Sequence, residues 1–194
     1  MIQCSDLREW GPMTPNVLLR DVTVEDLPIF FEHQLEPDAQ YMAAFTPKRK
    51  DDFTAHWTKI LSNDEIIKQS ILIDVHVVGN IVCFEQFGVR EIGYWIDKKY
   101  WGRGIATSAL SLFLLKVIER PLFAHVAKRN IGSLRVLQKC GFEMFGEDIS
   151  IPNELGESVE EFVLQCVGAP RFDAGGMPAL PGSYETSTSS QCNF

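Results

Sequence analysis

Apolar and polar residues alternate with two different periods along the chain, and these periods predict its elements. Strand-like patterns occur at residues 16–21, 70–78, 81–87, 91–97, 122–127, 142–149 and 159–167. Helical spacing of apolar residues occurs at residues 23–35, 51–61, 105–119 and 130–140. Consecutive strands with tight turns predict antiparallel pairing, and a strand–helix–strand crossover predicts a parallel pair. The predicted fold class is α/β, with a mixed and mostly antiparallel sheet that has one parallel junction and is flanked by helices.

Turn-forming residues mark the predicted connections between these elements. Gly79 and Asn80 are typical of a hairpin turn between the second and third strands. The segment from Pro37 to Lys50 is rich in turn-forming and cationic residues, so we predict a loop there. Thr23, followed three residues later by Asp26, indicates a helix start of the capping-box type.

Composition changes at both ends of the chain, which predicts one domain with two extensions. Residues 1–16 contain a glycine and two prolines and form an irregular lead-in. Residues 17–167 contain all of the periodic patterns and form the domain. Residues 168–194 are rich in Gly, Pro, Ser and Thr, which is typical of a flexible tail.

Charge and cysteine usage narrow the classes of partner. The formal net charge of −8 over 194 residues argues against nucleic acid or an anionic membrane as the main partner, because both need a basic face. The five cysteines form no CxxC pair, so we predict reduced thiols and no metal site. The first residues lack the pattern of a signal peptide, and we therefore expect a cytoplasmic protein.

The stretch from Gly93 to Gly104 (GYWIDKKYWGRG) predicts a strand, a glycine turn and then the start of a helix. Backbone N–H groups of such a turn point into one concavity, and the helix N-terminus adds a partial positive charge. Gly102 and Gly104 permit positive φ, and the small residues Ala106 and Thr107 leave room for a ligand above the first helical turn. This arrangement predicts a pyrophosphate-binding cradle.

Two common nucleotide motifs do not fit this cradle. The chain has no GxxxxGK[ST] segment. Gly102 and Gly104 lack a third small residue at the dinucleotide spacing, and the cradle follows an antiparallel meander rather than opening a βαβ unit. A plain nucleotide ligand such as ATP or NAD remains an alternative that binding experiments can separate.

The string EIGYWIDKKYWGRGIATSAL, followed by AHVAKRNIGSLRVLQKCGF, resembles the acetyl-coenzyme A (acetyl-CoA) binding core of the GNAT superfamily of acetyltransferases, in its RimJ/RimL-type branch. The resemblance covers residues 17–167 in element order and implies the GNAT fold with acetyl-CoA as co-substrate. The family's pyrophosphate loop, [QR]xxGx[GA], falls on residues 101–106, with Trp101 in place of the usual Gln or Arg.

The resemblance also implies where the donor binds. The strand that ends near Asp97 and the strand 122–127 would separate, leaving a gap for the pantetheine arm of the coenzyme. The backbone at Trp95 and Ile96 would contact that arm, and the side chain of Asn130 would reach its amide. The cofactor-binding residues expected in this way are Trp95, Ile96, Gly102, Arg103, Gly104, Ile105, Ala106, Thr107 and Asn130. Lys128 and Arg129 are candidates for the 3′-phosphate or are simply solvated.

Acetyl transfer to an amine needs a proton acceptor for the amine and a proton donor for the leaving thiolate. Glu91, on the strand that lines the acetyl site, is the first candidate base, and Glu85 on the preceding strand is the second. Many GNAT enzymes place a proton-donating Tyr seven residues after the motif Asn, but Leu137 occupies that position here. Ser133 is the replacement candidate. Each of these polar residues also has a purely structural or solvated interpretation, and we predict structural roles for the four histidines.

The resulting hypothesis is an enzyme that transfers acetyl from acetyl-CoA directly to a primary amine through a ternary complex. The acceptor class comprises protein N-termini, polyamines and other small amines, and the acidic hairpin at 143–161 is compatible with a cationic one. A homodimer is compatible with the sequence. The alternative from a different class is a catalytically weak acyl-CoA binding or sensing module, which the missing Tyr favours.

Overall fold

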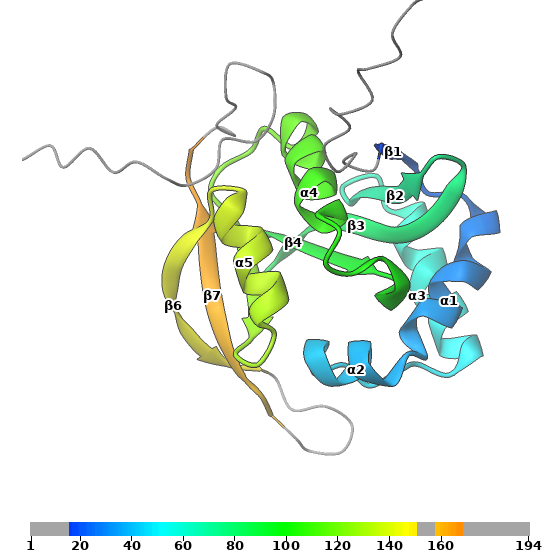
Figure 1. Cartoon of the computed structure of the whole chain (residues 1–194), viewed down its shortest axis with the longest axis horizontal. Coiled ribbons are helices and arrows are strands. Elements are labelled where there is room, and N and C mark those ends of the chain that lie inside the picture. The colour runs from blue at the N-terminus through cyan, green and yellow to red at the C-terminus, as the bar shows by residue number, and fades with distance from the viewer. Residues whose placement is uncertain (1–15, 151–157, 169–194) are drawn as a thin grey trace, which may run out of the picture.

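A mixed seven-stranded sheet runs through the computed structural model, which describes residues 16–150 and 158–168 (Figure 1). In the described residues the strand order is β1-β2-β3-β4-β5-β7-β6. The strands are β1 (Val17–Asp21), β2 (Ile67–Ile73), β3 (His76–Gln86), β4 (Val89–Ile96), β5 (Leu122–Ala127), β6 (Glu143–Ile149) and β7 (Glu160–Cys166). All neighbouring strands pair antiparallel except β4 and β5, which pair in parallel. The predicted fold class is confirmed.

The parallel junction is short, and the two strands separate beyond it. Described pairing between β4 and β5 is confined to Arg90 with Leu122 and Glu91 with Phe123. Towards its C-terminal end, β4 remains paired with β3 as far as Ile96, and β5 remains paired with β7 as far as Ala127. The sheet therefore opens between its two halves.

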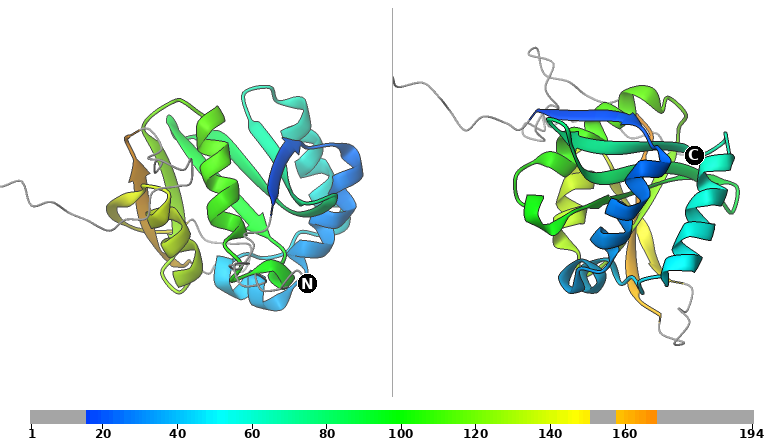
Figure 2. Two further views of the ribbon diagram at one scale, coloured as in Figure 1. Left: turned by 45° about the horizontal axis from the view of Figure 1, so that its top comes forward. Right: turned by 90° about the vertical axis from the view of Figure 1, so that its right-hand side faces the viewer.

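Helices cover both faces of the sheet (Figure 2). The helices are η1 (Val24–Asp26), α1 (Leu27–Gln34), α2 (Pro37–Ala43), α3 (Lys50–Ser62), η2 (Lys98–Tyr100), α4 (Ile105–Lys116) and α5 (Ile131–Lys139). The main core lies under α4 and α5 and includes Phe113, Leu137 and Phe142, each at most 2% exposed. A second core under α1 and α3 centres on Phe30 and Trp57, whose ring centroids are 5.0 Å apart. We refer to these faces as the α4/α5 face and the α1/α3 face.

Strand alternation assigns the polar residues of the opening to these two faces. Ile92 and Ile96 belong to the α4/α5 core and Tyr94 packs against it. Glu91 and Gly93 therefore point to the α1/α3 face. Consistent with this, a side chain added at Gly93 would meet Val82, which packs on the α1/α3 core. The opening between β4 and β5 thus joins two chemically different surfaces.

An ion pair between the partly exposed Arg20 and the buried Asp26 ties strand β1 to its neighbours. The Arg20 guanidinium contacts both carboxylate oxygens of Asp26 at 2.6 Å. Asp26 also accepts hydrogen bonds from the Thr23 N–H at 3.0 Å and the Ser70 hydroxyl at 2.7 Å. The contact between Thr23 and Asp26 is the one that the capping-box pattern predicts.

The predicted hairpin turn at Gly79 and Asn80 is wrong, because both residues lie inside β3. The turn is instead at residues 74–75, where Asp74 adopts a φ of 55°. Gly79 has a different role: a Cβ there would lie 2.1 Å from the Trp95 carbonyl oxygen. This glycine permits close approach of β3 to β4 rather than a reversal of the chain.

One helix and one helix end also differ from the sequence prediction. The segment predicted as a loop contains α2, which Pro37 begins and whose Ala39 is only 4% exposed. The helix predicted to reach residue 119 ends at Lys116, because Val117 becomes extended and its carbonyl accepts a hydrogen bond from Arg120 at 2.7 Å. The predicted lead-in, tail and polar turn at 152–156 lie outside the described residues, apart from Asn16 and Gly168.

Candidate functional site

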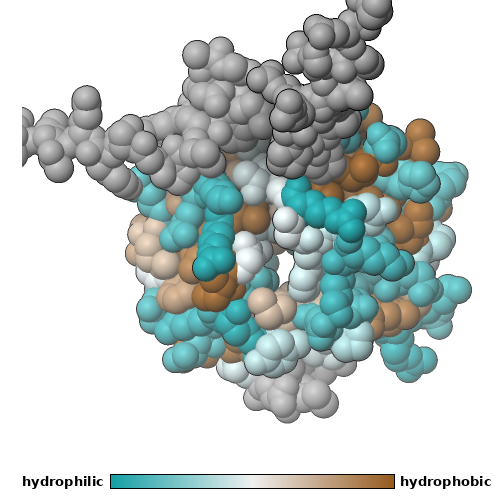
Figure 3. Space-filling view, in the orientation of Figure 1, coloured by the Kyte–Doolittle hydropathy of each residue, from teal (hydrophilic) through white to brown (hydrophobic). Residues whose placement is uncertain are grey.

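A cavity of about 420 Å³ lies at the glycine turn, between α5, α2 and the end of β4. Figure 3 shows the surface hollowed at the centre of this face. Eight of the nine predicted cofactor-binding residues line the cavity: Trp95, Ile96, Gly102, Gly104, Ile105, Ala106, Thr107 and Asn130. The structure therefore brings together residues that are 35 positions apart in sequence.

The turn before α4 has the conformation that the two glycines permit. Gly102 and Gly104 have φ values of 74° and 76°, and Gly104 is the N-cap residue of α4. The first N–H groups of a helix have no carbonyl partner within the helix, so they are available to an anion. Trp101 fixes the turn to the strand, because its indole Nε1 donates to the Ile96 carbonyl at 2.8 Å. That hydrogen bond gives Trp101 a structural role at the position where the family pattern has Gln or Arg.

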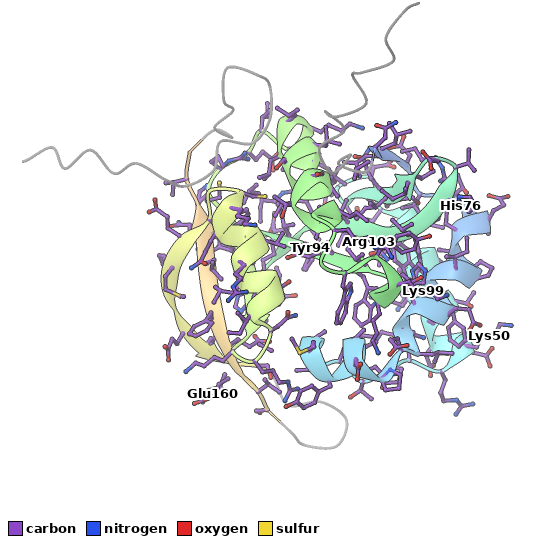
Figure 4. All side chains as sticks on the ribbon, viewed as in Figure 1. Lys50, His76, Tyr94, Lys99, Arg103 and Glu160 are labelled. Atoms are coloured by element: carbon purple, nitrogen blue, oxygen red, sulfur yellow. The ribbon has the colours of Figure 1, made fainter. Side chains whose placement is uncertain are left out.

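Cations near the cavity differ from those expected from the sequence. Arg135 and Lys139, four residues apart on α5, line the cavity. Lys128 instead contacts Glu147 at 2.6 Å, and Arg129 donates to the Tyr41 carbonyl at 2.6 Å. Arg103, the ninth predicted residue, is labelled in Figure 4 and is not among the residues that line the cavity. Its guanidinium carbon lies 5.5 Å from the centroid of the Tyr100 ring. The helical spacing of Arg135 and Lys139 was the sequence signal for this pair.

A smaller cavity of about 130 Å³ occupies the opening between β4 and β5. Its lining includes Tyr94, Ser133 and Leu137 on the α4/α5 side, and His125 and Glu161 on the other. Tyr94, Asn130 and Ser133 line both cavities, so the two cavities adjoin. The smaller cavity has lining residues from both faces of the sheet, and we call it the throat.

Hydroxyl groups lie at the α4/α5 side of the throat. The Tyr94 hydroxyl is 2.7 Å from the Ser133 hydroxyl, and Figure 4 labels Tyr94 on β4. Burial raises the pKa of Tyr94, although the hydrogen bond to Ser133 opposes the shift. Asn130 accepts a hydrogen bond from the Ser133 N–H at 3.0 Å through its side-chain oxygen, which leaves its amide NH₂ as a donor.

An imidazole between two carboxylates lies at the other side of the throat. His125 Nε2 is 3.7 Å from Glu91 Oε1, and His125 Nδ1 is 3.4 Å from Glu161 Oε2. Burial raises the pKa of Glu91; His125 opposes this shift and Glu161 reinforces it. Glu91 therefore holds a proton more readily than an exposed carboxylate does.

The structure separates the three predicted catalytic residues. Ser133 lines both cavities. Glu91 is buried beside the throat but lines neither cavity, and it reaches the throat through His125. Glu85 is exposed near the end of β3, pairs in register with Arg90 and lines neither cavity. The structure does not bring Glu85 to the site.

Sequence reasoning assigned no catalytic role to Tyr94, His125 or Glu161. Tyr94 and Glu91 occupy opposite faces of one strand, and the period of two was visible in the sequence. His125 and Glu161 meet only because β5 pairs with β7, which places His125 opposite Val163. That register depends on long-range pairing, and no local pattern reports it.

The described part of the chain contains no group of three or more His, Cys, Asp or Glu side chains that could hold a metal ion. None of its helices is long and apolar enough to span a membrane. The throat itself is lined by hydroxyl, imidazole and carboxylate groups of Tyr94, Ser133, His125 and Glu161.

Comparisons with known proteins agree with the fold. A sequence profile described as "Acetyltransferase (GNAT) domain" matches residues 16–143. The "Probable N-acetyltransferase YjcK" of Bacillus subtilis (strain 168) is 43% identical over 83 residues, which are 38% of this chain and 45% of that protein. The match thus spans less than half of that relative.

Solved structures share the fold at low sequence identity. Spermidine N-acetyltransferase from Vibrio cholerae, in complex with CoA and spermine, has a TM-score of 0.68 at 15% identity, over 78% of this chain and 95% of that one. A GNAT-family acetyltransferase from Bacillus anthracis has a TM-score of 0.67 at 21% identity, over 78% and 94%. Ribosomal-protein-S5-alanine acetyltransferase from Vibrio fischeri has a TM-score of 0.63 at 16% identity, over 78% and 92%.

Proposed function

Because the chain belongs to the GNAT family of acetyltransferases, we propose that it transfers the acetyl group of acetyl-CoA directly to a primary amine. The observation on which this rests is the pair of adjoining cavities. One follows the glycine turn that suits a pyrophosphate, and the other passes between β4 and β5 to a cluster of proton-accepting groups. Donor and acceptor can therefore meet in the throat without a covalent enzyme intermediate.

The donor would occupy the larger cavity. The turn at Gly102 and Gly104 would hold the pyrophosphate through backbone N–H groups, and Arg135 and Lys139 would add positive charge. The Asn130 amide would donate to the pantetheine arm on its way to the throat. Acetyl-CoA is a substrate in this scheme, and no metal takes part.

The acceptor would approach the throat from the α1/α3 face. An ammonium must lose a proton before it can attack the thioester carbonyl, and Glu91 is the carboxylate that we assign to this base function. The departing thiolate needs a proton, and Ser133, hydrogen-bonded to Tyr94, is the donor on that side. Holding both substrates in the throat would supply much of the remaining rate enhancement.

The finer assignments belong to the same proposal. We place the enzyme in the RimJ/RimL-type branch because of the YWGRGIATSAL segment, and in the cytoplasm because of its cysteine usage. Residues 17–167 form its catalytic domain. Protein N-termini and polyamines are the acceptor classes to examine first, since two structural neighbours are named for such substrates.

The competing function is an acyl-CoA sensor that does not turn over. Leu137 at the position of the family's Tyr favours it, whereas the hydroxyl pair at Tyr94 and Ser133 supplies an alternative proton donor. The test is release of coenzyme thiol when the protein and acetyl-CoA meet a panel of amines and N-terminal peptides. Amine-dependent release supports the enzyme, and tight CoA binding without release for any acceptor supports the sensor.

A further inference from the structure

His125 occupies a position in the throat that the base function requires. It lines the throat, whereas Glu91 does not, and its side chain is 31% exposed. An acceptor nitrogen in the throat would therefore meet the imidazole before it met the Glu91 carboxylate. The partial exposure also gives a proton on His125 a route to water.

A carboxylate lies near each of the two ring nitrogens of His125. Glu91 on β4 faces Nε2, and Glu161 on β7 faces Nδ1. Lys128, the residue that directly follows β5, is paired with Glu147 and Glu160. The charged groups that face the ring from the neighbouring strands are thus carboxylates, which hold the orientation of the ring.

We infer that His125 is the catalytic group that takes the proton from the acceptor ammonium, and that Glu91 and Glu161 are positioning residues that act through its ring. This inference rests on the proposed function and changes the role of Glu91 from direct base to partner of the base. The two carboxylates beside His125 would also attract a cationic acceptor.

The proton and bond changes balance as follows. The ammonium R–NH₃⁺ gives one proton to neutral His125, and the free amine attacks the thioester carbon. The C–N bond forms, the C–S bond breaks, and the thiolate takes a proton from Ser133, which recovers one as the nitrogen loses its second. His125 then releases its proton to water. The sum is amine cation plus acetyl-CoA giving amide, coenzyme thiol and one proton.

The experiment compares His125→Gln with the wild-type protein over pH 5.5–9. We expect kcat/KM to fall at least about 100-fold near pH 7, because general-base catalysis typically contributes this much. His76→Gln, at an exposed position on β3, is the matched control and should leave the profile unchanged. Unaltered CoA affinity and thermal midpoint in His125→Gln would show that the fold is intact.

Variants of the two carboxylates test whether Glu91 acts through His125 or takes the proton from the amine itself. Glu91→Gln and Glu161→Gln should each lower kcat while leaving the KM for acetyl-CoA unchanged, because the His125 ring loses a carboxylate that orients it. A His125→Gln variant that keeps its rate within about threefold, beside an inactive Glu91→Gln, would overturn the inference.

A measurement without turnover keeps this test distinct from that of the proposed function. The imidazole signals of His125 are followed by NMR in the CoA complex while n-butylamine is added. A shift of the His125 signals, with those of His76 unmoved, supports the amine site even if no acetylation occurs. Absence of any shift in a protein that also shows no turnover would overturn the inference.

Discussion

At the residue scale, Gly104 is the position where one side chain tests the donor site most sharply. Its φ of 76° is costly for a branched residue, although a Cβ there would meet no atom within 4 Å. Gly104→Val should therefore distort the turn, and we expect CoA affinity to fall about tenfold, equivalent to roughly 1.4 kcal/mol. Isothermal titration with CoA measures this change.

Gly88→Val is the matched control for that substitution. Gly88 has a φ of 79° in the turn between β3 and β4, and a Cβ there also meets no atom within 4 Å. The control should lose similar stability and keep its affinity for CoA. Equal affinity of Gly104→Val and wild-type protein would remove the turn from the donor site.

The candidate site shows which of its residues a sequence can identify and which it cannot. The glycine turn was predictable because positive φ restricts residue choice locally. Glu91 was predictable as a polar residue on an otherwise apolar strand. The neighbours of His125 were not, since Glu91 lies on β4 and Glu161 on β7, and only the sheet brings them together.

At the element scale, the Asp26 carboxylate joins β1 and η1 to β2. Burial would raise its pKa, but the contacts with Arg20, Thr23 and Ser70 prevail and lower it to about 2 from an ordinary 3.8. A depressed carboxyl pKa stabilises the fold above pH 4, and the contribution is lost as pH falls from 4 to 2. The size is roughly 2 kcal/mol.

Asp26→Asn should remove this part of the pH dependence. Urea unfolding of wild-type protein should show a loss of roughly 1.5 kcal/mol from this group between pH 4.5 and pH 2.5, and the variant should be less stable at neutral pH with a flatter profile. Asp52→Asn, an exposed position on α3, provides the control. Identical profiles for wild type and Asp26→Asn would contradict the account.

Helix α2 lines the larger cavity, where we propose that the donor binds, and Arg129 holds this helix in place. Ala39, Met42 and Ala43 line the larger cavity, and Arg129 holds α2 by its bond to the Tyr41 carbonyl and by lying 4.5 Å from the centroid of the Tyr41 ring. Arg129→Ala should accelerate amide exchange in α2 and raise the KM for acetyl-CoA several-fold. Hydrogen exchange and steady-state kinetics measure the two effects.

The exposed Arg49 supplies the control for α2. Arg49→Ala removes the same charge at the start of α3 and should change neither quantity. If amide exchange in α2 accelerates equally in both variants, the contact between Arg129 and Tyr41 does not fasten the helix.

The elements also show where sequence prediction failed. Alternation and helical spacing predicted the sheet and its helices because burial follows those periods. Gly79 was mistaken for a turn residue because its role, the approach to the Trp95 carbonyl, depends on the neighbouring strand. Helix α2 was missed because one buried residue, Ala39, gives little periodicity.

At the scale of the whole molecule, the two separated halves of the sheet predict a ligand with a phosphate end and a slender arm. CoA fits this shape, because the pyrophosphate would lie at the turn and the arm would reach the throat. We therefore expect CoA and acetyl-CoA to raise the thermal midpoint more than equal concentrations of ATP or NAD do. Greater protection by a plain nucleotide would contradict the assignment.

The fate of the acetyl group tests directly whether it passes from the coenzyme to an amine in the throat. Acetyl-CoA with a trideuterated acetyl group is incubated with the protein and an amine, and the intact masses of amine and protein are measured. The account predicts a trideuteroacetyl gain on the amine and none on the protein. An unmodified amine, or label that resides on the protein, would contradict it.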